Sequence, residues 1–211
     1  MAINVGQVIQ IINNIGDVME KNIEYLTELD SAIGDADHGI NMAKGFKAVK
    51  EKLSKIEANN VGDVLKVVGL TLVSNVGGAA GPLYGTAFMK GAAAANKEEI
   101  DIEDFINILR NAAEGIKMRG KSKRGEKTIL DSLEPALEAL IYGREKKLDN
   151  MVIIENMRDE ALKGVEYTKG IVATKGRASY LGERSLGHQD PGATSCYLML
   201  NEIYSFLAKE N

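Results

Sequence analysis

Three aspartates, Asp30, Asp35 and Asp37, lie close together in the stretch LDSAIGDADHGIN, residues 29–41. Carboxylates repel one another, so a cluster of three is costly unless a multivalent cation neutralises it. Asp35 and Asp37 point the same way in an extended chain, and a turn at Gly34 would bring Asp30 to them. Oxygen ligands suit Mg²⁺, which proteins commonly bind together with phosphates. The alternative is that Asp37 caps the following helix while the other two face water, and spacing alone leaves both open.

Other metal sites fit the sequence less well. A calcium-binding EF-hand loop needs a bidentate glutamate at its twelfth position, and counting twelve from Asp35 reaches Phe46. A tetrahedral zinc site is built from cysteine and histidine, of which the chain has only Cys196, His38 and His188. The scarcity of soft ligands therefore favours oxygen-binding ions, Mg²⁺ or Ca²⁺.

A glycine-rich segment, NVGGAAGPLYGTA at residues 75–87, surrounds the expected start of a helix. Its glycines would let backbone N–H groups and a helix N-terminus approach a phosphate. A tight turn between two helices, followed by close helix packing, explains the same residues. Taken alone the segment favours the turn, because no strand precedes it and it matches no known phosphate-binding fingerprint.

Residues 115–122, GIKMRGKS, match the P-loop pattern G-x-x-x-x-G-K-[ST] at every position. That pattern binds phosphates when a strand leads into the loop and a helix follows it. Gly115 instead lies in an expected amphipathic helix, so we reject the P-loop interpretation. The basic residues that follow are most simply a solvated loop, and the alternative is a positive rim for an anionic ligand. They are Lys121, Lys123, Arg124 and Lys127.

A third polar segment, residues 174–192, contains a second helix start. Pro191 suits the first helical position behind Asp190 as a cap, and this start offers another helix N-terminus to an anion. Arg177 can place its forked guanidinium on phosphate oxygens. We reject a Ser-His-Asp hydrolase site here, because no G-x-S-x-G elbow or strand positions a nucleophile. The residues concerned are Ser185 or Ser195, His188 and Asp190.

The composition is that of an ordinary globular chain, with 211 residues of which 45% are hydrophobic and 27% charged. The net charge of −4 argues against binding nucleic acid through a broad basic face. A single cysteine cannot form an internal disulfide, which makes a reducing cytoplasm the expected location. We find neither a signal-peptide pattern nor an apolar stretch of about 18 residues, so we expect no membrane span.

Apolar residues recur at three- and four-residue steps almost throughout, which predicts helices and no convincing strand. In residues 101–120 the stripe begins behind Asp101 as a cap and ends at Gly120. The other expected helices are 4–28, 40–57, 62–76, 83–96, 129–142, 150–171 and 192–208. We therefore predict an all-α fold, a single domain over residues 1–211 made of eight roughly antiparallel helices.

Three connections are long for a helical bundle, namely 29–39, 119–128 and 173–191. Such loops usually serve a function or are disordered, and these hold the polar segments described above. Pro135 should either kink its helix or mark a first turn that starts at Ser132. A carboxylate cluster, glycine-lined helix starts and an arginine are together the parts of a magnesium–nucleotide site.

Four segments, in the right order, resemble the nucleotide-binding L subunits of dihydroxyacetone kinases. They are GDADHGINM (34–42), VGGAAGPLYGT (76–86), RGKSKRGEKT (119–128) and KGRASYLGERSLGHQDPGATS (175–195), of which the last carries most weight. The resemblance runs from end to end of the chain. It implies an antiparallel barrel of eight helices with ADP or ATP bound at one end, in a phosphotransferase that needs no protein nucleophile.

The resemblance also implies site residues. Asp30, Asp35 and Asp37 would hold two Mg²⁺ ions that bridge to the phosphates. Related sequences often have serine where this chain has Ala80, so backbone N–H groups would have to replace a hydroxyl there. The residues implied to contact the nucleotide are His38, Gly39, Ile40, Asn41, Gly78, Ala79, Ala80, Gly120, Ile129, Arg177, Asp190, Pro191 and Gly192.

A free-standing L subunit further resembles the type that depends on the phosphotransferase system. In that type, bound ADP accepts a phosphoryl group from a phosphohistidine on an M subunit, and the ATP formed phosphorylates dihydroxyacetone on a K subunit. Two other functions remain open. The protein could be an ATP-dependent kinase subunit that exchanges its nucleotide at each turnover, or a signalling protein whose nucleotide state decides whether it binds a transcription regulator. The sequence leaves the oligomeric state open, a homodimer included.

Overall fold

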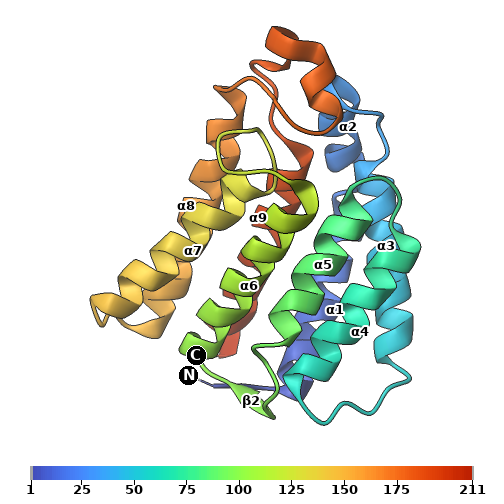
Figure 1. Ribbon diagram of the computed structural model, residues 1–211. Coiled ribbons are helices and arrows are strands. Elements are labelled where there is room, and N and C mark those ends of the chain that lie inside the picture. Colours follow the sequence, from blue (N-terminus) through green and yellow to red (C-terminus); the bar gives the residue numbers. More distant parts are fainter. Residues whose placement is uncertain (1, 211) are drawn as a thin grey trace. The chain divides into compact units, whose positions relative to one another are not determined.

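The computed structural model describes residues 2–210. Within this range the chain forms nine α-helices, one 3₁₀ helix and two strands of two residues each (Figure 1). The predicted all-α fold is confirmed, and strands this short are invisible to a search for period-two alternation. None of the helices in this range is long and apolar enough to cross a membrane.

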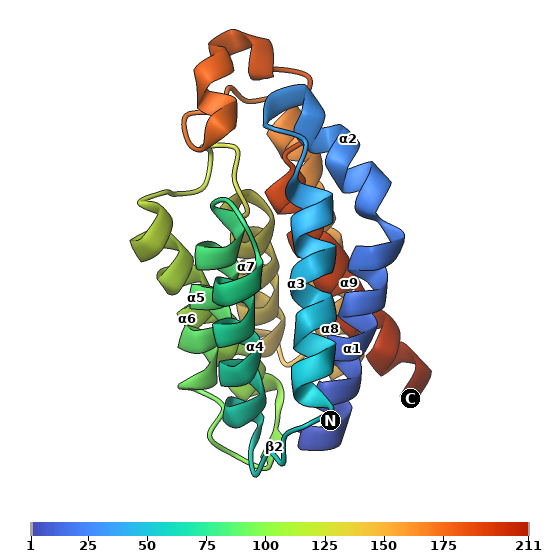
Figure 2. The ribbon, with the colours of Figure 1, turned by 90° about the vertical axis from the view of Figure 1, so that its right-hand side faces the viewer.

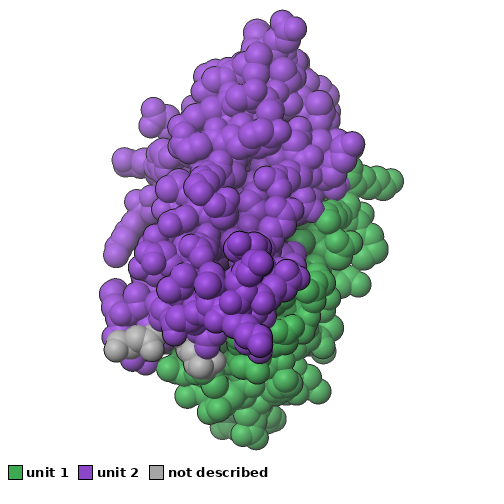
Figure 3. All heavy atoms as spheres, turned by 90° about the vertical axis from the view of Figure 1, so that its left-hand side faces the viewer, with its two compact units in different colours: residues 1–17, 41–121 green, residues 18–40, 122–211 purple. Residues whose placement is uncertain are grey.

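The chain divides into two compact units, which Figure 3 colours separately. The first contains residues 1–17 and 41–121, and the second contains residues 18–40 and 122–211. Each unit therefore combines two separate stretches of sequence. Two helices contribute residues to both units, α1 (Val5–Lys21) and α3 (His38–Leu53).

In the first unit α5 packs against both α4 and α6 (Figures 1 and 2). The bounds of these helices are Val61–Asn75 for α4, Ala80–Ala92 for α5 and Ile102–Gly120 for α6. Glycine lets α4 and α5 approach closely, since a Cβ on Gly69 would lie 2.7 Å from the carbonyl oxygen of Gly85. The short strands β1 (Ile3–Asn4) and β2 (Glu99–Ile100) pair antiparallel, and β2 leads into α6.

Both predicted ends of α6 are confirmed. Asp101 caps the helix through a capping box with Asp104, in which each side chain accepts a hydrogen bond from the other residue's backbone. Gly120 is the last helical residue. The left-handed conformation that ends the helix belongs to Lys121 (φ 47°), where glycine is the usual residue.

In the second unit α7, α8 and α9 pack against one another. Their bounds are Leu130–Glu145, Asn150–Lys169 and Pro191–Glu210. The helix α2 (Ile23–Ile33) contacts α9 and the 3₁₀ helix η1 (Arg177–Ser185). As predicted, α9 opens with Pro191, and the side chain of Asp190 accepts a hydrogen bond from the N–H of Ala193 at 2.7 Å.

Pro135 lies inside α7, and this helix begins at Leu130, before the predicted first turn at Ser132. Pro135 has no N–H to donate to the carbonyl of Asp131, one turn earlier. The backbone of Gly164 in α8 lies against this carbonyl, because a Cβ on Gly164 would be 2.0 Å from its oxygen. The proline and the glycine thus allow α7 and α8 to pack closely.

The prediction of one helix over residues 4–28 is wrong, because α1 ends at Lys21 and α2 begins at Ile23. Between them, the side-chain amide of Asn22 donates a hydrogen bond to the carbonyl of Val18 at 2.8 Å, while the Asn22 backbone (φ −106°, ψ 17°) leaves the helical region. The predicted connection 29–39 is also too long. The connection is shorter because α2 continues to Ile33 and α3 starts at His38, and the break at Asn22 gives the described chain nine α-helices rather than eight.

Candidate functional site

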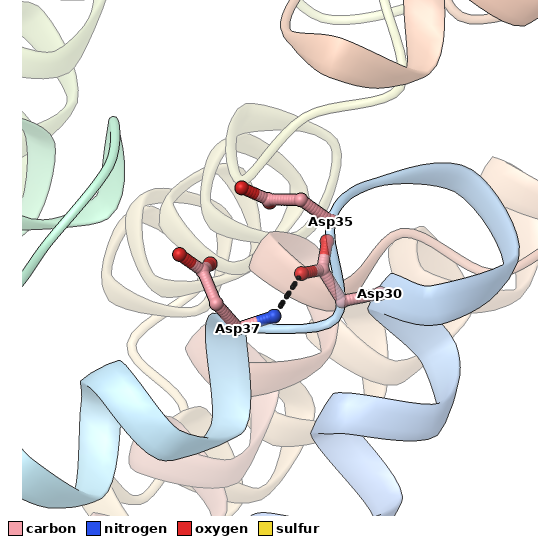
Figure 4. A group of neighbouring side chains, drawn as sticks. All are labelled: Asp30, Asp35 and Asp37. Carbon is pink, nitrogen blue, oxygen red and sulfur yellow. Dashed lines mark hydrogen bonds between the residues drawn. The ribbon is translucent and has the colours of Figure 1, made fainter.

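Three carboxylates of the second unit converge around the connection between α2 and α3 (Figure 4). Asp30, Asp35 and Asp37 each offer one oxygen atom, and these atoms lie within 4.8 Å of one another. Asp30 is buried, Asp37 is half-buried and Asp35 is exposed. The turn expected at Gly34 therefore does bring the three side chains together, and metal binding by them stays a prediction.

Two residues with unusual surroundings shape this connection. A Cβ on Gly34 would lie 2.0 Å from Oδ1 of Asp30, so the glycine makes room for the carboxylate. Ala36 adopts a left-handed conformation (φ 60°), which alanine rarely does. Backbone strain of this kind, placed between Asp35 and Asp37, is typical of functional sites.

Asp30 also caps the start of α3. Its Oδ2 accepts hydrogen bonds from the backbone N–H groups of Asp37 (2.9 Å) and His38 (3.2 Å). A carboxylate is favoured at this position because a helix N-terminus carries partial positive charge. The sequence left open whether Asp37 is a helix cap or part of an ion site. In the structure Asp30, from α2, caps the start of α3, and it also faces the carboxylates of Asp35 and Asp37.

Arg177, the first residue of η1, reaches the aspartate cluster. Its Nη2 lies 2.8 Å from Oδ2 of Asp35. Both side chains are substantially exposed, so this ion pair contributes little to stability. The ion pair places the guanidinium of Arg177 beside the carboxylates of the cluster. A small apolar cluster of Ile33, Ala173 and Ala178, with Leu181 packed against it, lies where η1 meets α2.

His38 begins α3 and contacts α9. Its Nε2 lies 2.8 Å from Oγ of Ser195, and that hydroxyl lies 3.1 Å from the carbonyl oxygens of Pro191 and Gly192. Burial lowers the pKa of His38 to about 4, against an opposing effect of Asp30. The imidazole is therefore neutral at pH 7, and its ring is held by a hydrogen bond to the first turn of α9.

The next residues of α3 are suited to close contact. A Cβ on Gly39 would lie 2.2 Å from the carbonyl oxygen of Ile23 and 2.6 Å from Oγ1 of Thr27, so only glycine lets this turn lie against α2. Ile40 is 54% exposed, although isoleucine is normally buried. Its apolar side chain is thus available to a ligand.

The start of α9 lies beside Ile129. A Cβ on Gly192 would be 3.7 Å from the backbone nitrogen of Ile129. Burial raises the pKa of Asp190 to about 7, although a hydrogen bond from Ala193 opposes the shift. Within the second unit, the start of α3, the start of α9 and Ile129 are therefore brought together, as a nucleotide site would require.

The remaining predicted contact residues belong to the first unit: Asn41, Gly78, Ala79, Ala80 and Gly120. The glycine-rich segment forms the predicted tight turn between α4 and α5, in which Gly78 has φ +63°. A Cβ on Gly77 would lie 3.1 Å from the side chain of Asn41, which places Asn41 beside this turn. Binding of phosphate by the turn stays a prediction.

The first six residues of the P-loop-like pattern, 115–120, lie in α6, as expected. The basic loop after it differs from the predicted solvated loop at one position. Lys127 is 1% exposed and therefore not part of any solvated surface. Lys121, Lys123 and Arg124 are exposed, and Arg124 pairs with Glu138 at 3.0 Å.

Sequence reasoning missed two residues that organise this region. Asp131 is fully buried and accepts hydrogen bonds from the N–H groups of Gly125 (2.5 Å) and Thr128 (2.7 Å). The spacing of Thr128 and Asp131, typical of a capping box, could have revealed it. No local pattern could have revealed Ser195 as the partner of His38, because the two residues are 157 positions apart.

The donors of the aspartate cluster fit a hard divalent cation. All three are carboxylate oxygens, which Mg²⁺ prefers over nitrogen or sulfur. His38 is neutral and directed at Ser195, and Arg177 is the cation that an anionic group, such as a phosphate, would meet beside the cluster. The arrangement can therefore hold a cation and an anionic group next to each other.

Residues 32–205 match the DAK2 domain family. The chain is 43% identical over 211 residues to the ADP-binding subunit DhaL of the PEP-dependent dihydroxyacetone kinase of Escherichia coli strain K12, and the match covers all of both chains. It is 44% identical over 193 residues to the ADP-binding subunit DhaL of PEP-dependent dihydroxyacetone kinase 1 of Listeria innocua serovar 6a, with 91% of each chain covered.

Solved structures of the dihydroxyacetone kinase of C. freundii share the fold. The native form matches with a TM-score of 0.74 at 22% identity, and the complex with AMP-PNP and Mg²⁺ matches with a TM-score of 0.71 at 21% identity. These matches cover 94% and 97% of this chain but only 34% of the C. freundii chain. From the domain match and the identity to full-length relatives, the chain belongs to the DAK2 domain family and, within it, to the DhaL subunits of dihydroxyacetone kinases.

Proposed function

We propose that this protein is the nucleotide-binding subunit of a phosphoenolpyruvate-dependent dihydroxyacetone kinase, and that it holds ADP or ATP together with Mg²⁺. The observation that carries the proposal is the convergence of Asp30, Asp35 and Asp37 beside Arg177. The names of the DhaL relatives, which describe ADP-binding subunits, support the nucleotide. The C. freundii kinase in complex with AMP-PNP and Mg²⁺ supports the metal.

The residues of the second unit have distinct roles in this proposal. The three aspartates coordinate two Mg²⁺ ions, which neutralise phosphate charge. Arg177 binds phosphate oxygens, as its forked guanidinium suits. The first turns of α3 and α9 contact the nucleotide through the residues already assigned there, namely His38, Gly39, Ile40, Asp190, Pro191 and Gly192, together with Ile129.

For the first unit, the resemblance supports nucleotide contacts at five residues: Asn41, Gly78, Ala79, Ala80 and Gly120. Gly78, Ala79 and Ala80 would bind through backbone N–H groups, because Ala80 offers no hydroxyl. Asn41 lies beside that turn. None of these side chains is a nucleophile, which is consistent with phosphoryl transfer that depends on positioning and charge neutralisation.

The proposed reaction is a relay in which the protein keeps its nucleotide. A phosphohistidine on an M subunit loses its N–P bond as a phosphoryl group passes to the β-phosphate of the bound ADP. A hydroxyl of dihydroxyacetone, held by a K subunit, then takes the γ-phosphoryl group of the ATP formed and releases its proton to solvent. The bond between the β- and γ-phosphates breaks, and bound ADP is regenerated. Relatives of matching length that are named PEP-dependent support this type over an enzyme that uses free ATP.

Native mass spectrometry of gently purified protein tests the proposal, since it counts bound nucleotide and metal together. We expect one ADP per chain and bound Mg²⁺. A coupled assay then adds phosphoenolpyruvate, the general phosphotransferase proteins and subunits M and K, and we expect dihydroxyacetone to be phosphorylated. Equal activity with free ATP alone would exclude the relay and leave the ATP-dependent subunit in its place.

Substitution of the cluster tests its role directly. We expect Asp35→Asn and Asp37→Asn each to weaken retention of ADP strongly, by about 100-fold, because loss of one carboxylate weakens the bridging metal. The helical fold should survive, since removal of a charge relieves repulsion. Far-UV circular dichroism and ADP release during dialysis measure the two effects, and ADP affinity unchanged in both variants would exclude the metal-binding cluster.

A further inference from the structure

Lys127 is the most unusual residue that the proposed nucleotide site does not use. Its side chain is 1% exposed, and lysine is almost never fully buried without partners. Its backbone also adopts a left-handed conformation (φ 59°), which lysine rarely does. The chain thus maintains both a desolvated charge and local strain at this position, which lies in the loop between α6 and α7.

The ammonium of Lys127 joins two long connections of the second unit. Its Nζ donates hydrogen bonds to the backbone carbonyls of Ser185 (2.8 Å) and His188 (2.5 Å). A second link lies nearby, where the N–H of Thr174 donates to the carbonyl of Glu126 at 3.3 Å. The loop 121–129 and the segment 173–190 are therefore held together from within.

The carbonyls that Lys127 binds lie next to residues of the proposed site. Ser185 is the last residue of η1, whose first residue is Arg177, and His188 precedes the cap of α9 at Asp190 by two positions. Ile129 follows Lys127 by two positions. We propose that Lys127 is a positioning residue for nucleotide binding, whose ammonium holds the segments that carry Ile129, Arg177 and Asp190 in their binding arrangement. This inference rests on the proposed function.

Two buried acidic residues act on the ammonium through their charge. Burial lowers the pKa of Lys127, and Asp190 and Asp131 oppose this shift. Asp131 is itself bound by the N–H groups of Gly125 and Thr128 in the same loop. Removal of the ammonium would leave the carbonyls of Ser185 and His188 without their donor, so the segments should separate.

The test compares Lys127→Met, which keeps the length of the side chain without its charge, with Lys127→Gln, which keeps one donor group. Ser132→Ala is the matched control. It removes another buried hydrogen bond of the same unit, from Ser132 to the carbonyl of Ala161 at 3.1 Å, and Ser132 is not in the proposed site. Release of radiolabelled ADP into an unlabelled chase is measured with Mg²⁺ present, at a temperature where circular dichroism shows each variant folded.

We expect Lys127→Met to release ADP at least about tenfold faster than the control, with Lys127→Gln between the control and Lys127→Met. Thermal unfolding of each variant separates this effect from a general loss of stability. Release from Lys127→Met that is no faster than from Ser132→Ala would overturn the inference, and Lys127→Gln decides by the same criterion if Lys127→Met does not fold. Failure of the proposed function is distinct, because the wild type itself would then carry no ADP.

Discussion

The carboxyl group of Asp190 is buried, and its shifted pKa makes the stability of the protein depend on pH. Burial raises its pKa from 3.8 to about 7. Between these values the folded state keeps a proton that the unfolded state has released, so stability falls as the pH rises through this range. We expect Asp190→Asn, which keeps an oxygen acceptor for the N–H of Ala193, to remove this dependence.

Urea unfolding of nucleotide-free protein at several pH values between about 4 and 7 measures the effect of Asp190→Asn. The free energy of unfolding of the wild type, relative to the variant, should fall by up to about 1.4 kcal/mol per pH unit. Ser132→Ala changes no carboxyl group and should leave the slope of the wild type intact. If the curves of the wild type and Asp190→Asn run parallel, Asp190 is ionised in the folded protein throughout.

The residues of the site differ in how far the sequence reveals them. The convergence of Asp30, Asp35 and Asp37 was predictable, because all three lie near one turn. The burial of Lys127 was not, because its partners Ser185 and His188 are 58 and 61 positions away. The pattern of charges in a loop describes that loop alone. It cannot show that carbonyls of a distant segment will accept hydrogen bonds from a lysine and bury it.

At the scale of secondary structure, the packing of α7 on α8 depends on a missing side chain. A Cβ on Gly164 would lie 2.0 Å from the carbonyl oxygen of Asp131, a backbone atom that cannot turn away. We expect Gly164→Ala to destabilise the protein by about 1 to 3 kcal/mol through overpacking, although alanine is the better helix former. Urea unfolding measures the loss.

Gly170→Ala is the control for Gly164→Ala at the end of the same helix. The nearest atom to its added Cβ is the carbonyl oxygen of Tyr167 at 3.6 Å, an ordinary contact, and its φ of −86° suits alanine. This variant should be close to neutral. Equal stabilities of the two variants would mean that α7 and α8 have room to move apart.

Hydrophobic periodicity predicted most of the helices, since a 3.6-residue repeat is a local property. It missed the break at Asn22, because the backbone there leaves the helical region (φ −106°, ψ 17°) without interrupting the apolar stripe. It also missed η1, because its nine residues are broken at Gly182 (φ 55°) into pieces too short for a periodic pattern, and the segment contacts α2. The ninth α-helix follows from the break at Asn22, and the connections are shorter than predicted because η1 forms and α2 continues to Ile33.

At the scale of the whole molecule, a ligand that binds only the folded state must raise its stability. We expect ADP with Mg²⁺, at about 100 times its Kd, to add about 2.7 kcal/mol to the free energy of unfolding. For a chain of this length that corresponds to a rise in Tm of roughly 5 to 10 °C. Thermal unfolding followed by circular dichroism measures it.

Removal of the metal checks whether the nucleotide depends on the aspartate cluster. Addition of EDTA should abolish most of the rise in Tm, and Asp35→Asn should show little rise even with Mg²⁺ present. A rise of the same size with ADP and EDTA would mean that the nucleotide is held without a metal, and the proposed role of the cluster would then be wrong.

The contact between Gly34 and Asp30 has a consequence for how this protein can change over generations. Any side chain at position 34 would occupy the space of Oδ1 of Asp30, and Asp30 in turn holds the first backbone groups of α3. A substitution at position 34 would force the Asp30 carboxylate out of its place, and a shorter side chain at position 30 would remove that carboxylate from the cluster. Selection for the proposed metal site would therefore also act against substitution of Gly34, although nothing about the glycine itself is reactive.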